Sequence, residues 1–74
     1  MEIVPEKMEE RQFIAATEHI VAALKERGYD PYSQLTGYVI ENEPTYITSH
    51  KGARQLIITL DRGKVKKYVE RMMK

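Results

Sequence analysis

The two histidines are the residues in this 74-residue chain whose type could most readily support a metal site or acid–base chemistry. His19 and His50 lie far apart, and the chain offers neither a cysteine nor a cluster of carboxylates at ligand spacing from them. A protein zinc site needs three or four such ligands. We therefore predict no metal and no cofactor, and interpret His19 as a helix-surface residue. His50 is interpreted as a structural hydrogen-bonding residue, with a binding role as the alternative.

Two pairs of glutamates could in principle act as general acid and base. Glu9 and Glu10 form one pair, and Glu41 and Glu43 form the other. Nothing near either pair suggests an apolar pocket that would favour a protonated carboxyl, so solvated charges at helix ends explain both. The chain also lacks a glycine-rich phosphate loop, a Gly-x-Ser-x-Gly motif and kinase signatures. The sequence therefore indicates a protein that is not an enzyme.

The length of the chain limits how it can be stabilised. We expect a single domain, residues 1–74, and a domain this short buries only about 60% of the surface that its unfolded form exposes. Because there is no cysteine, no disulfide can add stability, and association with a second copy is the expected supplement. No apolar run approaches the roughly 20 residues of a membrane span, and residues 1–8 do not resemble a signal peptide. These features predict a cytoplasmic protein without membrane insertion.

Charge is unevenly distributed along the chain, although the net charge is only +1. Residues 1–27 and 28–50 are acidic on balance, and residues 28–50 contain no lysine or arginine. Residues 51–74 hold eight of the twelve lysines and arginines and only two of the eleven acids. This basic segment could face nucleic acid, an acidic protein surface or the acidic part of a second copy.

Apolar spacing and capping residues predict three helices. Residues 8–27 have apolar side chains at a period near 3.6, and Gly28 is suited to end that helix. Asp30 and Pro31 form a start signal for a second helix over residues 31–41, since the carboxylate can cap the free amides and proline fits the first position. A third helix is expected over residues 62–73, with Asp61 as its cap and an apolar stripe beside basic residues.

The segment 45–60 can be interpreted in two ways from the residues alone. Tyr46-Ile47-Thr48 and Ile57-Ile58-Thr59 are rich in β-branched residues and favour short strands. The stretch 53–56 between them favours a helix, with Ser49 as its possible cap. Propensity does not decide between the two.

The tyrosines are concentrated near the predicted turns, where Tyr29, Tyr32, Tyr38 and Tyr46 follow one another closely. A tyrosine combines a large apolar ring with a hydroxyl, so it suits a small core, a self-association surface or a partner-binding hot spot. Within the same stretch, Gly37 offers a place where another part of the backbone could approach the second helix closely.

Several ordered motif elements in the middle of the chain resemble the IreB family of small bacterial regulatory phosphoproteins. The resemblance rests on the segments 28–40, 43–47 and 50–54, which carry Gly-Tyr-x-Pro, Gln, Gly-Tyr, Pro-x-Tyr-Ile and His-x-x-Ala-Arg elements in that order. It implies an interaction region whose motif residues are Tyr29, Pro31, Gln34, Gly37, Tyr38, Tyr46, His50 and Arg54.

The resemblance implies an all-α fold, a small helical domain of three to five helices, forming an intertwined or side-by-side homodimer. It also favours helix over strand in residues 45–60. Family members belong to low-GC Gram-positive bacteria and their relatives. They act in the pathway of a membrane Ser/Thr kinase and restrain cell-wall synthesis. The implied partners are therefore a second copy of the chain and a cell-envelope regulatory protein or kinase.

One departure from the family concerns phosphorylation. The phosphoacceptor threonines of the family lie in an N-terminal arm, but residues 1–16 here contain no serine or threonine, and Thr17 falls inside the first predicted helix. The remaining candidate acceptors lie near proposed helix starts, where a phosphate could gain from the helix dipole. These candidates are Ser33, Thr45, Thr48 and Ser49.

Two functions from different classes fit these observations. The first is a dimeric regulatory protein that binds its partner through the surface around residues 29–54. Arg54 is its candidate recognition residue, because a guanidinium can hold a carboxylate or phosphate with two bonds. Alternatively, Arg54 ties the loop near Asp30 or Glu43 into the fold. The second function is a small dimeric DNA-binding protein that uses the basic C-terminal helix. Against it, residues 28–50 contain no lysine or arginine that could contact phosphates.

Overall fold

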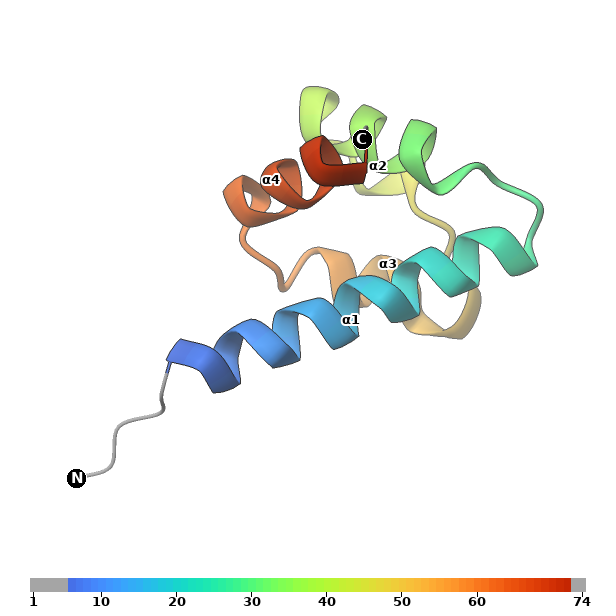
Figure 1. The fold of residues 1–74 in the computed structure, drawn as a ribbon. Helices are drawn as coiled ribbons and strands as arrows, with labels where there is room; N and C mark the ends of the chain where they lie inside the picture. The colour runs from blue at the N-terminus through green and yellow to red at the C-terminus, as the bar shows by residue number, and fades with distance from the viewer. Residues whose placement is uncertain (1–5, 73–74) are drawn as a thin grey trace.

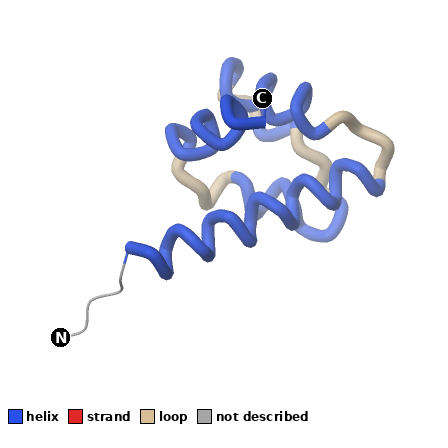
Figure 2. Tube along the Cα trace, viewed as in Figure 1, coloured by secondary structure: helices blue, strands red, loops and turns tan. Residues whose placement is uncertain are grey.

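Four α-helices and two short 3₁₀ turns make up the part of the chain that the structure, a computed structural model, describes (Figure 1). The description covers the backbone of residues 6–72 and the side chains of residues 11–72. Within residues 6–72 there is no strand (Figure 2), so the predicted all-α fold is confirmed. The elements are α1 (Glu6–Glu26), α2 (Pro31–Glu41), the 3₁₀ turns η1 (Pro44–Tyr46) and η2 (His50–Gly52), α3 (Ala53–Ile57) and α4 (Arg62–Met72).

The end of α1 is fixed by a glycine, as the sequence predicts. Gly28 has a φ of 83°, a conformation that costs a residue without a Cβ very little. Its amide donates to the Lys25 carbonyl at 2.9 Å, and the Tyr29 amide donates to the Leu24 carbonyl at 2.9 Å. This pair of bonds is a Schellman motif, which satisfies carbonyls that the end of the helix leaves free. The chain therefore reverses direction sharply before α2.

The start of α2 is fixed by Asp30, and the predicted helix 31–41 has the observed bounds. The Asp30 carboxylate accepts a bond from the Ser33 amide at 3.0 Å and another from the Ser33 hydroxyl at 2.7 Å. These bonds, the hydroxyl bond first, lower the pKa of Asp30. The helix ends at Asn42, whose φ of 54° lies in the left-handed region that asparagine tolerates better than most residues.

The last helix also starts at its predicted cap. The Asp61 carboxylate accepts a bond from the Lys64 amide at 3.1 Å, and the Asp61 carbonyl accepts one from Val65 at 3.0 Å. The structure describes α4 as far as Met72. Residue 73 of the predicted helix 62–73 lies outside the described residues.

In residues 45–60 the helical alternative is the one observed. Ile57 belongs to α3 and Ile47 follows η1, and both are completely buried, so their branched side chains pack in a helical core rather than in a sheet. The prediction that Ser49 caps the helix at 53–56 is wrong. Ser49 precedes η2 without a capping side-chain bond, and Gly52 is the residue that precedes α3.

The core lies where all four helices meet. In Figure 1, α1 runs diagonally beneath α2 and α4, with α3 beside it. At the edge of the core, the rings of Phe13 on α1 and Tyr68 on α4 meet edge to face, 6.5 Å apart. Burial, with a smaller contribution from Glu18, raises the pKa of Tyr68. The buried apolar residues are Ile20, Ala23, Leu24, Leu35, Tyr38, Ile47, Ala53, Ile57, Val65 and Val69.

None of the helices found between residues 6 and 72 combines the length and the apolar character needed to cross a membrane.

Candidate functional site

The motif residues surround the connection between α2 and α3, residues 43–52, which we call the clamped connection. It contains η1 and η2 and lies against α1, α2 and α3. Each of these helices contributes at least one side chain that bonds to it. The clamped connection is therefore an irregular segment that long-range contacts hold in one conformation.

From α2, two motif residues hold Tyr46. The Gln34 side-chain amide donates to the Tyr46 carbonyl at 2.8 Å. The Tyr46 ring lies directly over Gly37, where an added Cβ would be 2.5 Å from the ring atom Cε1. The predicted close approach at Gly37 is therefore observed, but the group that approaches the helix is an aromatic ring and not a backbone segment. The two motif residues thus fix the ring and the backbone of Tyr46 together.

From α3, Arg54 holds the middle of the clamped connection. Its Nε donates to the Ile47 carbonyl at 2.8 Å, and the Ile47 side chain is completely buried. Among the residues described, Arg54 forms no ion pair with Asp30 or Glu43, but its bond to Ile47 ties the loop that begins at Glu43 into the fold, which is the structural alternative predicted for this residue. The bond uses one N–H of the guanidinium, and the two terminal nitrogens form no ion pair with any side chain of residues 11–72.

From α1, Glu26 and His19 hold the end of the clamped connection. Glu26 Oε1 lies 2.8 Å from His50 Nε2 and 3.1 Å from Lys51 Nζ. His19 Nε2 lies 2.9 Å from the Lys51 carbonyl oxygen and donates to it when that nitrogen carries the proton. His19 is exposed, as predicted, and His50 forms the structural hydrogen bond expected of it.

The Glu26 carboxyl should titrate below its ordinary pKa of 4.5. Hydrogen bonds from His50 and then Lys51 lower its pKa. A carboxyl with a lowered pKa stabilises the fold above its unfolded-state pKa, and this contribution is lost as the pH falls through the folded-state pKa. We expect His50→Gln to raise the Glu26 midpoint, measured by NMR titration of its side-chain carboxyl.

The control for this titration is His19→Gln, because His19 bonds to the Lys51 backbone and not to Glu26. It should leave the Glu26 midpoint nearly unchanged. Since Glu26 is exposed, added salt should reduce the difference between the wild type and His50→Gln. An unchanged midpoint in His50→Gln would show that the His50 bond does not govern the Glu26 carboxyl.

The remaining motif residues divide into buried and exposed positions. Pro31 is buried at the start of α2, and Tyr38 is 5% exposed and belongs to the core. Tyr29 is 48% exposed and Tyr46 is 36% exposed. Tyr29 and Tyr46 are thus the two motif tyrosines that a partner could reach, and Tyr38 positions α2.

The candidate phosphoacceptors differ in how their hydroxyls are used. Ser33 donates to Asp30, Thr45 donates to Glu43 Oε2 at 2.8 Å, and Thr48 accepts from the His50 amide at 3.1 Å. Ser49 is exposed beside His50. Thr17, in contrast, is completely buried, and its hydroxyl donates to the Phe13 carbonyl. A kinase could therefore not reach this hydroxyl in the folded protein.

Sequence reasoning missed Glu26 and Lys51 as part of this site. Neither has a neighbour in the sequence that indicates a pairing, since the Glu26–His50 contact joins residues 24 positions apart. Among the side chains of residues 11–72, no three His, Asp or Glu residues gather as a metal site would require. The arrangement consists of hydrogen bonds and ion pairs that fix a surface segment.

The family model described as IreB regulatory phosphoprotein matches residues 1–74, the whole length of the chain. The matched range includes every helix described above and the whole clamped connection.

Proposed function

Because this chain belongs to the IreB family of regulatory phosphoproteins, we propose that it is a non-catalytic cytoplasmic regulator that acts by binding another protein. The family match over the full length is the observation that carries this proposal. Its expected pathway is that of a membrane Ser/Thr kinase that controls cell-wall synthesis, which the regulator restrains. The partner is a cell-envelope regulatory protein or the kinase itself.

The proposed partner-binding surface is the exposed side of residues 29–54. Tyr29 and Tyr46 offer aromatic rings with hydroxyls, the type of side chain that often dominates the energy of protein interfaces. Arg54 is half-buried, and its terminal nitrogens could bind a carboxylate or phosphate while Nε keeps its bond to Ile47. The bonds that fix the clamped connection support this role, because a preorganised surface loses less entropy on binding.

A homodimer is part of the proposal. The exposed apolar side chains Ile14, Ile40 and Ile58 are available for self-association, and small domains without disulfides commonly gain stability in this way. The first turns of α1 also extend beyond the other helices in Figure 1 and could contact a second copy. Sedimentation equilibrium tests this: a mass of one chain at micromolar concentration would exclude the dimer.

Phosphorylation, if it regulates this chain, must use a site other than the N-terminal arm of the family. We propose Ser49 as the best placed of the four candidates, since it is exposed and lies two residues before Lys51, whose ammonium group could pair with a phosphate. Incubation with the cognate kinase followed by mass spectrometry tests the proposal. Phosphorylation only of residues other than Ser49 would contradict the choice of Ser49. The absence of any phosphorylated residue would contradict regulation of this chain by phosphorylation.

Deletion of the gene tests the proposed pathway. Loss of a negative regulator should raise the incorporation of labelled N-acetylglucosamine into the cell wall, and the wild-type gene should restore the original rate. Unchanged incorporation in the deletion strain would contradict a role in restraining cell-wall synthesis. This experiment needs no assumption about which surface of the protein binds the partner.

Arg54→Ala tests the proposed surface. We expect it to weaken capture of the partner from native lysate at least about 10-fold, as loss of a charge-assisted contact of about 1.4 kcal/mol would do. Arg71→Ala is the matched control, because Arg71 is an exposed arginine in the last turn of α4. Circular dichroism should show that both variants fold. A folded Arg54→Ala protein with unchanged capture would remove the recognition role.

A further inference from the structure

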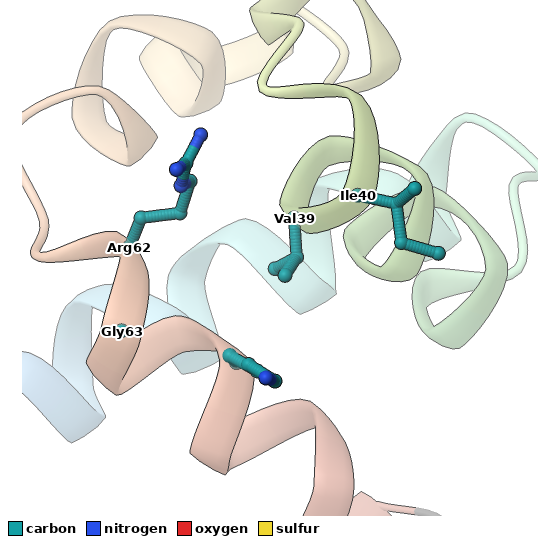
Figure 3. Close-up of a pocket in the computed structure, with 5 residues that line it drawn as sticks. Val39, Ile40, Arg62 and Gly63 are labelled. Carbon is teal, nitrogen blue, oxygen red and sulfur yellow. The ribbon is translucent and has the colours of Figure 1, made fainter.

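A groove between α2 and α4 lies outside the clamped connection, and its α4 side has no part in the function proposed so far. It encloses about 370 Å³, near the lower end of the range of ligand sites, so it suits one or two side chains better than a large cofactor. Figure 3 shows it with Val39 and Ile40 on α2 and Arg62 and Gly63 on α4. The lining residues of this α2–α4 groove are Val39, Ile40, Arg62, Gly63 and Lys66.

The α2 side of the groove is apolar and reaches solvent. Ile40 is 73% exposed, the largest exposure among the large apolar side chains recorded for residues 11–72. Burial of an exposed isoleucine removes apolar surface from water, so a bound aliphatic side chain would gain from this contact. Gly63 lies opposite on α4, where an added Cβ would be 3.2 Å from Asp61 Oδ2, so the Asp61 carboxylate borders the groove at this position.

The α4 side of the groove is cationic. Arg62 and Lys66 lie one helical turn apart, both are exposed, and neither has an ion pair recorded among the described residues. The nearby Asp61 carboxylate already caps the Lys64 amide. Along its length α4 carries five basic residues and one acid, so the positive potential is not confined to these two side chains.

We propose that the α2–α4 groove binds an acidic segment of a partner protein, with one aliphatic side chain against Val39 and Ile40 and carboxylates on Arg62 and Lys66. Charge complementarity selects this occupant, because Val39 and Ile40 line the same groove as two cations that form no ion pair with any side chain of residues 11–72. Nucleic acid would satisfy the cations, but residues 28–50 offer its phosphates no lysine or arginine, and its only aliphatic group is the small thymine methyl. The inference rests on the proposed role in protein binding and is independent of the pathway.

The test uses a synthetic peptide in which one leucine is flanked on each side by three glutamates, with both ends blocked. Titration into the ¹⁵N-labelled full chain should shift the amide signals of Val39, Ile40 and Gly63. We expect the double variant Arg62→Glu/Lys66→Glu to bind at least about 10-fold more weakly, because charge reversal replaces attraction with repulsion. Replacing the peptide leucine with alanine should also weaken binding, by a few-fold or more.

The matched control is Lys64→Glu/Lys67→Glu, which makes the same change of net charge on the same helix at residues that do not line the groove. It should weaken binding much less than the groove variant. If both double variants weaken peptide binding equally, or if replacing the peptide leucine with alanine does not change binding, then net charge alone explains the binding. Either result would overturn the proposal. Shifts confined to residues outside the groove would overturn it as well.

Two other occupants are distinguished in the same experiment. If Ile40→Asp abolishes self-association in sedimentation experiments and the peptide does not bind, the groove is a contact between copies of this chain and the proposal fails. If a DNA duplex shifts the groove signals at low salt and the peptide does not, the groove belongs to nucleic-acid binding, and the proposal fails again. Failure of the peptide with a positive gene-deletion result would leave the proposed function intact.

Discussion

Ile47→Ala should remove about 2–5 kcal/mol of the free energy of unfolding, the usual cost of truncating a buried isoleucine. Ile47 is completely buried although it lies in an irregular segment, and its carbonyl accepts the Arg54 bond. A domain of this size has about 4–11 kcal/mol of stability in total, so the variant should be close to unfolding. Urea denaturation followed by circular dichroism measures the change.

Ile58→Ala is the matched control for this result, since it makes the same truncation at a side chain that is 56% exposed. It should cost less than about 1 kcal/mol, because most of its apolar surface already contacts water. Both variants should be measured at two protein concentrations, to separate unfolding from any loss of self-association. Equal costs for the two variants would show that Ile47 does not anchor the clamped connection in the core.

The end of α1 and the starts of α2 and α4 could be predicted because their signals are local. Asp30 caps α2 and Asp61 caps α4 through bonds to amides only three residues away, and Gly28 ends α1 through its own backbone conformation. Such interactions depend on the nearest neighbours in the chain and little on the rest of the fold. The bounds of α2 therefore agreed with the prediction to the residue.

The conformation of residues 45–60 could not be predicted from these local signals. Ile47 has extended φ and ψ angles, so its β-propensity is expressed, but it pairs with no strand in the described part and is buried by helices instead. Lys51 adopts a φ of 55°, a left-handed conformation that a lysine rarely takes. In this conformation Lys51 contacts Glu26 through its side chain and His19 through its carbonyl. Both partners are distant in the sequence, so local signals do not reveal these contacts.

The motif residues could be selected from the sequence, but their roles could not. Gln34 bonds to Tyr46, Arg54 to Ile47 and His50 to Glu26 across 12, 7 and 24 positions. Three of the motif residues thus hold the clamped connection in place, a role that requires the tertiary structure to recognise. The resemblance to a family selected these residues, and the geometry explains what several of them contact.

The effect of Gly37→Ala on the free energy of unfolding should change sign when Tyr46 is replaced by alanine. Alanine is favoured over glycine inside a helix by about 0.5–1 kcal/mol, so the substitution alone should stabilise α2. The new Cβ would lie 2.5 Å from the Tyr46 ring, and displacing a packed group usually costs about 1–3 kcal/mol. We therefore expect Gly37→Ala to destabilise the protein that has Tyr46 and to stabilise Tyr46→Ala, with urea denaturation as the measurement.

The double-mutant cycle isolates the contact between the Tyr46 ring and α2 from the helix preference, because the preference for alanine is the same in both backgrounds. The difference between them should reach about 1–3 kcal/mol if the ring is fixed over Gly37. The bond from Gln34 to the Tyr46 carbonyl makes this expectation stronger, since the backbone of Tyr46 cannot shift freely to relieve the overlap. Stabilisation by Gly37→Ala in both backgrounds would mean that the ring moves away at little cost, and Tyr46 would then be a mobile surface residue without a fixed place in the proposed interaction surface.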